Sequence, residues 1–189
     1  MPLPATQVIT APVRLAFPSL AKMRQRAVNS DKLTYQATFL LPPDFDLAPL
    51  HNAMRAAFGL KFPAGTKIPP DTLPIRDAGA KEWAGFVAGW RYISTHADRP
   101  IGVVDQYAQP VPADARDVLF YGGCWVKAHL NAYGWSHQTG GKGISFGLVG
   151  VQFVRDDDRF DGRAPAGDAF EPLADLPQNL AQSDDALPF

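Results

Sequence analysis

Residues 117–135 read DVLFYGGCWVKAHLNAYGW, the longest strand-like run of the chain. Successive side chains of a β-strand point to opposite faces of the sheet. On that alternation one face of residues 118–131 is a core set, made of Val118, Phe120, Cys124, Val126, Ala128 and Leu130. The other face is mixed and carries Leu119, Tyr121, Gly123, Trp125, Lys127, His129 and Asn131. This pattern predicts a sheet with one buried face and one open face.

The same alternation predicts further strands on both sides of this run. They are VITAPVRLAF (8–17), LTYQATFLL (33–41), FVAGWRYIS (86–94), IGVVD (101–105) and GISFGLVGVQFVR (143–155). In the first of these we expect Ile9, Val13, Leu15 and Phe17 to share one face. Residues 61–81 and 109–117 are expected to be loops, and GGKG (140–143) is expected to be a turn.

A single short helix is predicted over residues 46–60, with Asp46 as its N-cap and Gly59 at its end. Its apolar stripe consists of Leu50, Met54, Ala57 and Phe58. Five or six strands with one helix and long loops predict an all-β fold, an OB-fold-like barrel of five to six strands. A β-sandwich is the alternative architecture.

Composition narrows the class of protein. Hydrophobic residues make up 46% of the 189 residues, which is enough for a core. No apolar run approaches the ~20 residues of a membrane span, and the first ten residues lack the pattern of a secretory signal. The single cysteine excludes an internal disulfide, which fits a reducing cytoplasm. We therefore expect a cytoplasmic protein without a membrane partner.

Charge divides the chain into two parts. Residues 1–155 hold 16 Lys and Arg against 10 Asp and Glu, a net charge of +6. Residues 156–189 hold 2 against 9, a net charge of −7. The sequence thus predicts a folded domain over residues 1–160 and a disordered acidic tail over 161–189. A basic body with an acidic tail favours nucleic acid as the partner of the body.

Aromatic and basic residues on the open strand faces are candidates for DNA contact. Tyr121, Trp125 and Lys127 combine rings for base stacking with a cation, although a loop covering the rings would explain the same pattern. Trp90, Arg91 and Tyr92 form a second such cluster, of which adjacent members must face opposite sides. Cations for the DNA backbone complete the set: Arg14, Lys22, Arg24, Arg26, Lys32 and Lys142.

Enzyme motifs do not fit the sequence. GGKG lacks the P-loop spacing, because Lys142 is followed by Gly143 and Ser136 stands where the first glycine belongs. Cys124, His129 and His137 have no paired ligand motif for a metal, and the Asp156–Asp158 run lacks the glycine and glutamate of a calcium loop. We predict no catalytic residue, no metal and no cofactor.

Three stretches together resemble a family of phage and prophage single-stranded DNA-binding proteins, formerly a domain of unknown function. They are KLTYQATFLLPP (32–43), FYGGCWVKAHLNAYGW (120–135) and GISFGLVGVQFVRDDDRFDGR (143–163). The family is OB-fold-like and distantly similar to the T7-type phage protein. The resemblance implies a non-enzymatic protein of the bacterial host cell that coats single strands without sequence specificity in phage replication and recombination.

The last seven residues, SDDALPF (183–189), are similar to the acidic Pro-Phe tails of bacterial single-stranded DNA-binding proteins. That resemblance implies docking of replication and recombination proteins on Asp184, Asp185, Leu187, Pro188 and Phe189. Leu187 stands where the bacterial tails usually have isoleucine, so the identity of the partner stays open. An RNA-binding barrel and an accessory subunit of a DNA-processing enzyme with a metal site are the alternative functions. A homo-oligomer is compatible with the sequence.

Overall fold

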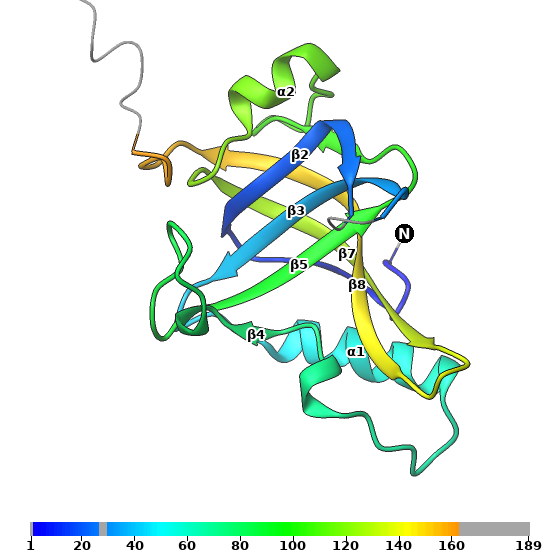
Figure 1. The fold of residues 1–189 in the computed structure, drawn as a ribbon. Helices are drawn as coiled ribbons and strands as arrows, with labels where there is room; N and C mark the ends of the chain where they lie inside the picture. The colour runs from blue at the N-terminus through cyan, green and yellow to red at the C-terminus, as the bar shows by residue number, and fades with distance from the viewer. Residues whose placement is uncertain (1, 27–29, 163–189) are drawn as a thin grey trace, which may run out of the picture.

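The computed structural model describes residues 2–26 and 30–162 (Figure 1). The strands are β1 (Gln7–Ile9), β2 (Val13–Gln25), β3 (Leu33–Leu41), β4 (Arg76–Asp77), β5 (Arg91–Ala97), β6 (Gly102–Val104), β7 (Trp125–Ser136) and β8 (Lys142–Arg155). The helices are α1 (Ala48–Lys61) and α2 (Ala113–Leu119), with short 3-10 turns at Pro70–Thr72 and Ala78–Ala80.

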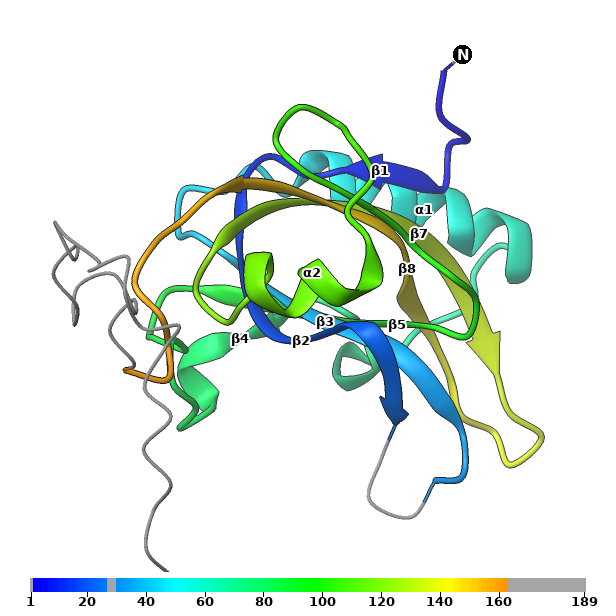
Figure 2. The same ribbon diagram turned by 90° about the horizontal axis from the view of Figure 1, so that it is seen from above.

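Five of the strands close into a barrel, seen from above in Figure 2. β2 pairs with β3 and β3 with β5, both antiparallel, and β5 then pairs with β8 in parallel. β8 pairs with β7, and β7 returns to β2, which completes the circle. This order, with one parallel neighbour pair, is that of the OB-fold, so the predicted barrel is confirmed.

The barrel interior is filled by alternate side chains of these strands. The largest fully buried ones include Phe39, Phe146, Leu15, Ile93 and Leu130. Helix α1 covers one end of the barrel through Leu50, Ala53, Met54 and Ala57, at the bottom of Figure 1. Helix α2 lies at the opposite end, where the guanidinium of Arg116 donates to the carbonyl of Leu20 over 3.1 Å.

The predicted strand over residues 8–17 is wrong in two respects. A bend at Ala11–Pro12 separates β1 from β2, and β2 continues to Gln25. Ile9 and Phe17, expected in the core, are 54% and 55% exposed. Phe17 leaves the core because the register of β2 against β3 shifts between Ala16 and Ser19, which breaks the alternation.

The predicted strand over residues 117–135 begins too early. Residues 113–119 form helix α2 rather than loop and strand, and Val118 is 78% exposed on it. Gly122 and Gly123 follow in a turn, and Gly123 has a φ of +119°, so the extended chain starts only at Trp125. Phe120 and Cys124 are buried as expected, although they precede the strand.

Two other boundaries move by a few residues. Helix α1 runs through Gly59 to Lys61, and the Asp46 carboxylate accepts from the Ala48 N–H over 2.9 Å just before the helix starts. The strand expected from residue 86 begins at Arg91, because Gly85 and Gly89 both adopt positive φ and form a turn.

Candidate nucleic-acid interface

A groove runs over the outer face of β3 and β5, the strands at the front of Figure 1. It consists of two adjoining cavities of about 430 Å³ and 620 Å³, which share Arg26 and His96. Gln36 of β3, which pairs with His96, and Ser94 and His96 of β5 form its floor. We call it the β3–β5 groove.

Several segments supply the walls of the β3–β5 groove, among them residues 144–149 of β8 and residues 98–100 after β5. The β2–β3 connection contributes Arg26 and Lys32. Residues 71–76, which include Arg76 at the start of β4, border the other end. The outer face of β7 contributes Tyr133 and Trp135. Elements far apart in the sequence thus bring cations and aromatic rings to one groove.

The charge in the groove is mainly positive. Arg26, Lys32, Arg76 and Arg99 line it, against Asp71 and Asp98, and Lys32 pairs with Asp98 over 3.5 Å. Burial, together with the charges of Arg26 and Lys32, lowers the pKa of His96 below its ordinary value, while Asp98 opposes this shift. The imidazole therefore sits in a positive field that an anionic ligand would offset.

The aromatic rings of the groove come from one face of β7. The Trp135 indole donates to the Ser145 hydroxyl over 3.0 Å, and its ring centroid lies 5.1 Å from that of His137. The Tyr133 hydroxyl lies 3.4 Å from Nε2 of His96. Both rings are partly exposed, and their exposed parts lie beside the cations of the groove.

The structure brings some of the sequence-predicted residues to this groove. Arg26 and Lys32 line it, while Lys22 and Arg24 are exposed on β2 and Lys142 is the first residue of β8. Tyr92 borders the groove but is only 4% exposed, so the expectation that its ring is open for stacking is wrong. Its ring packs edge-on against Phe86, with centroids 5.3 Å apart.

Trp90 and Arg91 lie in a separate cavity of about 380 Å³, together with Arg76. Trp90 precedes β5 in the turn, so strand alternation does not govern it and both residues line the same space. This cavity adjoins the β3–β5 groove through Arg76.

The firmest sequence candidates, Tyr121 and Trp125, already have partners within the chain. Residues 156–162, which we call the C-terminal strap, fold back over them after β8. The Trp125 indole donates to Asp157 over 2.6 Å, and the Tyr121 hydroxyl donates to Asp156 over 2.9 Å. The indole hydrogen bond lowers the pKa of Asp157, and partial burial raises the pKa of Tyr121.

Arg14, another predicted DNA contact, also holds the C-terminal strap. Its guanidinium donates to the carbonyls of Gly123 and Asp158 over 2.9 and 2.7 Å and lies 4.6 Å from the Phe160 ring centroid. Arginines also cover one face of each candidate ring: Arg155 lies over Trp125 at 4.7 Å and Arg159 over Tyr121 at 4.2 Å. Contacts within the chain thus already engage the polar atom and one face of each of these two rings, as expected if a loop covers them.

Lys127 lies on β7 opposite Gln152, outside the residues that line the β3–β5 groove. The sequence pattern nevertheless contained the missed residues of the groove. Tyr133 and Trp135 continue the same period-two face of β7 beyond Asn131. No comparable pattern marks Arg76 or His96, which only the folded chain brings together.

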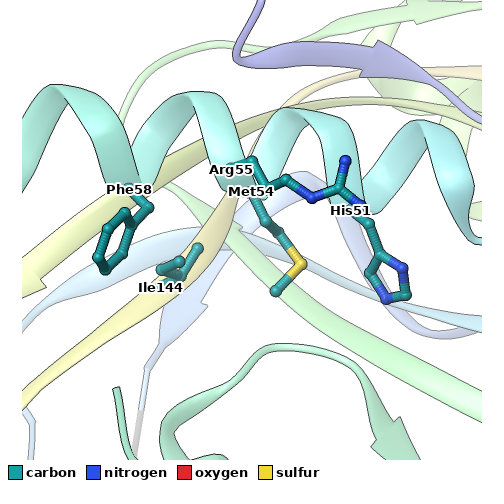
Figure 3. A pocket seen from close by; sticks show the side chains of 5 residues that line it. All are labelled: His51, Met54, Arg55, Phe58 and Ile144. Atoms are coloured by element: carbon teal, nitrogen blue, oxygen red, sulfur yellow. The ribbon is translucent and has the colours of Figure 1, made fainter. Parts of the chain in front are cut away.

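A smaller cavity of about 300 Å³ lies between α1 and β8 (Figure 3). Met54, Phe58 and Ile144 make it apolar, with His51 and Arg55 at the same site. Ile144 lines both this cavity and the β3–β5 groove, so the two are neighbours.

The described residues 2–26 and 30–162 contain no group of three His, Cys, Asp or Glu side chains that could hold a metal. Cys124 is fully buried, and burial raises the pKa of its thiol to about 12. Within the same part of the chain, neither helix has the length and apolarity of a bilayer span.

A closed OB barrel with a groove of cations and aromatic rings defines a nucleic-acid-binding protein of the OB class. The chain belongs to the family described as "Enterobacter phage Enc34, ssDNA-binding protein", whose model matches residues 6–186. The resemblance seen in the sequence is thereby confirmed.

A curated relative and solved structures agree with this assignment. "Putative protein p50" of Acyrthosiphon pisum secondary endosymbiont phage 1 is 31% identical over 93% of this chain and 95% of its own length. The single-stranded DNA-binding protein of bacteriophage Enc34, solved in complex with single-stranded DNA, superposes with a TM-score of 0.71 at 21% identity, over 82% of this chain and 89% of its own. For gp2.5 of bacteriophage T7 the TM-score is 0.55 at 14% identity, over 84% and 97%.

The C-terminal strap yields a testable prediction at Gly123. Its φ of +119° strains any side chain, and an added Cβ would collide with the carbonyl oxygen of Asp158. We expect Gly123→Ala to detach the strap and to speed trypsin cleavage after Arg155 and Arg159. Cleavage rates followed by mass spectrometry provide the measurement.

Gly140→Ala is the matched control, because Gly140 also has a positive φ, of +95°, but nothing lies within 4 Å of its added Cβ. It carries the backbone cost of about 1 kcal/mol or more without touching the strap. Equal acceleration of cleavage by both variants would show that global destabilisation, and not strap release, exposes the two arginines.

Proposed function

We propose that this protein binds single-stranded DNA in the β3–β5 groove. The observation that carries the proposal is the meeting of Arg26, Lys32 and Arg76 with Tyr133 and Trp135 along one groove. Cations there neutralise backbone phosphates, while the partly exposed rings stack on unpaired bases. Family membership and the single-stranded DNA named for the Enc34 structure support this function.

Binding in this groove would read little sequence. Every base has a π-face, so stacking on Trp135 accepts all four bases, and arginine contacts to phosphates are blind to the base. The Ser94 hydroxyl on the floor already bonds the buried hydroxyl of Thr38, 3.2 Å away. The function is therefore coating of single strands by a binding protein rather than catalysis, in the infected bacterial cell during replication and recombination.

The acidic end of the chain has a second role in this proposal. Asp184, Asp185, Leu187, Pro188 and Phe189 lie outside the described residues, so the argument for them rests on the sequence. An aromatic residue that follows a pair of aspartates suits capture in a partner's pocket. We propose that this end recruits replication and recombination proteins.

Salt dependence distinguishes the β3–β5 groove from the β7 face that carries Trp125 and Lys127. Affinity for oligo-dT should fall as salt rises, with a slope of about −0.7 per phosphate contact, and duplex should bind more weakly because its bases are already stacked. Arg26→Ala should flatten the slope by about one contact, whereas Lys127→Ala should leave it unchanged. Fluorescence titrations over a range of salt concentrations measure both.

The two tryptophans provide the matching test of stacking. Trp135→Ala should weaken binding by about 1–3 kcal/mol. Trp125→Ala should instead lower the melting temperature, because it removes the hydrogen bond to Asp157. Loss of DNA binding in Trp125→Ala and Lys127→Ala would instead show that DNA binds at the first residues of β7, outside the groove. Tighter binding of an RNA oligomer than of DNA would favour the RNA-binding alternative.

The pH dependence of binding should report on His96. In the DNA-free protein the pKa of His96 lies below the ordinary value of 6.5. DNA phosphates would raise this pKa, because they offset the charges of Arg26 and Lys32. The bound state then takes up a proton, so affinity should rise as pH falls from about 7 toward about 5.5, by at most about tenfold per pH unit. His96→Gln should remove this rise.

His129→Gln is the matched control for this measurement. His129 also has a pKa lowered by burial, but its ring bonds Gln7 between β1 and β7, outside the groove. Arg26, Lys32, Asp98 and Tyr133 are the charged or titratable groups facing His96 and stay intact in both variants. A pH profile that is the same in wild type and in His96→Gln would contradict the assignment.

Deletion of Phe189 tests recruitment separately from DNA binding. It removes no aspartate and moves the terminal carboxylate to Pro188, so DNA affinity should stay unchanged. Capture of replication and recombination proteins from host lysate should be lost, because an aromatic anchor in a pocket carries much of an interface's energy. Identical sets of captured proteins from full-length and shortened baits would show that this end recruits nothing.

A further inference from the structure

Next to the β3–β5 groove the outer face of the barrel carries an exposed group of aromatic rings. Phe17 and Trp83 are 55% and 45% exposed and meet edge-on with centroids 5.4 Å apart. Phe86 lies beneath them, 5.8 Å from Phe17 and 5.2 Å from Trp83. We call Phe17, Trp83 and Phe86 the aromatic patch.

Two buried rings connect the aromatic patch to the groove. The Phe86 ring packs against Tyr92, with centroids 5.3 Å apart, and Tyr92 lines the groove beside Ser94. Tyr92 also pairs across the sheet with Arg76, another lining residue. A single strand that follows the groove along β5 toward Tyr92 therefore arrives at the aromatic patch.

The backbone at Phe17 is held in a costly conformation that turns its ring outward. Phe17 has a φ of +48°, in the left-handed region that bulky residues rarely adopt. Leu15 and Leu20 on either side are buried in the core, and strict alternation would send Phe17 there as well. The bulge between Ala16 and Ser19 instead aims the ring at solvent, so the strain gains no core packing.

Cations accompany the exposed rings. The Lys81 ammonium lies 5.0 Å from the centroid of the Trp83 ring. Such a contact at an exposed site is worth only about 0.5–1 kcal/mol, so the ammonium is free to exchange it for a phosphate. Exposed rings beside a cation match a nucleotide, whose base stacks while its phosphate finds a positive charge.

We propose that Phe17 and Trp83 form a stacking subsite for an unpaired base at the end of the β3–β5 groove, with Lys81 contacting the adjacent phosphate. The inference rests on the proposed function and extends the DNA path to residues outside the groove. The subsite predicts that the effect of these residues on affinity depends on the length of the oligonucleotide. Short oligonucleotides fill the groove alone, whereas longer ones also reach the aromatic patch.

Binding of a ladder of oligo-dT, from about 4 to about 16 nucleotides, tests the subsite. Trp83→Ala should weaken binding of the long oligonucleotides by about 5- to 150-fold and leave the shortest unchanged. Trp83→Phe keeps a ring and should restore most of the affinity. Val87→Ala is the matched control, because Val87 is 50% exposed in the same connection before β5 but has no ring, and it should bind like wild type.

Phe17→Gly separates stacking from stability. Glycine accepts the positive φ at this position without strain, so the melting temperature should hold while affinity for long oligonucleotides falls. Wild-type affinity of Trp83→Ala and Phe17→Gly at every length would overturn the subsite. The groove function would still stand if Arg26→Ala remained weakened, whereas failure of the wild type to bind single strands would remove both.

Discussion

The closure of the barrel between β2 and β7 is the contact on which the rest of the structure depends. Val13 pairs with Val126 and Arg14 with Trp125, and backbone bonds from Leu15 to Cys124 and from Gly123 to Leu15, of 2.9 and 2.8 Å, extend the seam. Without them β2 and β7 would each have an open edge. Closure also encloses the side chains of both strands, which is why Val13, Leu15 and Val126 are completely buried.

The seam also determines which contacts the nearby charged and aromatic side chains make. Arg14 and Trp125 face the same Asp157, so the C-terminal strap fastens over the place where the two strands meet. Phe160 continues the strap and would leave no room for a side chain at Gly85, where an added Cβ would lie 2.5 Å from the ring. Residues with the chemistry of a DNA contact thus hold the chain to itself at this end of the barrel.

The β3–β5 groove lies on strands that the strap does not occupy, and its floor and walls have separate origins. Regular pairing of β3 with β5 sets the floor, which Gln36, Ser94 and His96 line. The walls come from connections and from β7 and β8, so their cations and rings converge only after closure. This arrangement leaves polar groups between two charged borders, as a path for an extended polyanion requires.

Periodicity in the sequence was sufficient for the barrel, because core alternation, as in β7 and β8, is a local property that repeats every second residue. The residues that carry the family resemblance likewise lie in contiguous stretches of the sequence. The sequence pattern did not predict that residues 113–119 are helical or that the Phe17 ring turns outward. Nor did it predict that the Trp125 indole donates a hydrogen bond to Asp157. Those outcomes depend on the bulge in β2, on glycines with positive φ, and on Asp157 of the strap, which lies 32 residues beyond Trp125. Contacts between such distant segments exist only once the chain has folded.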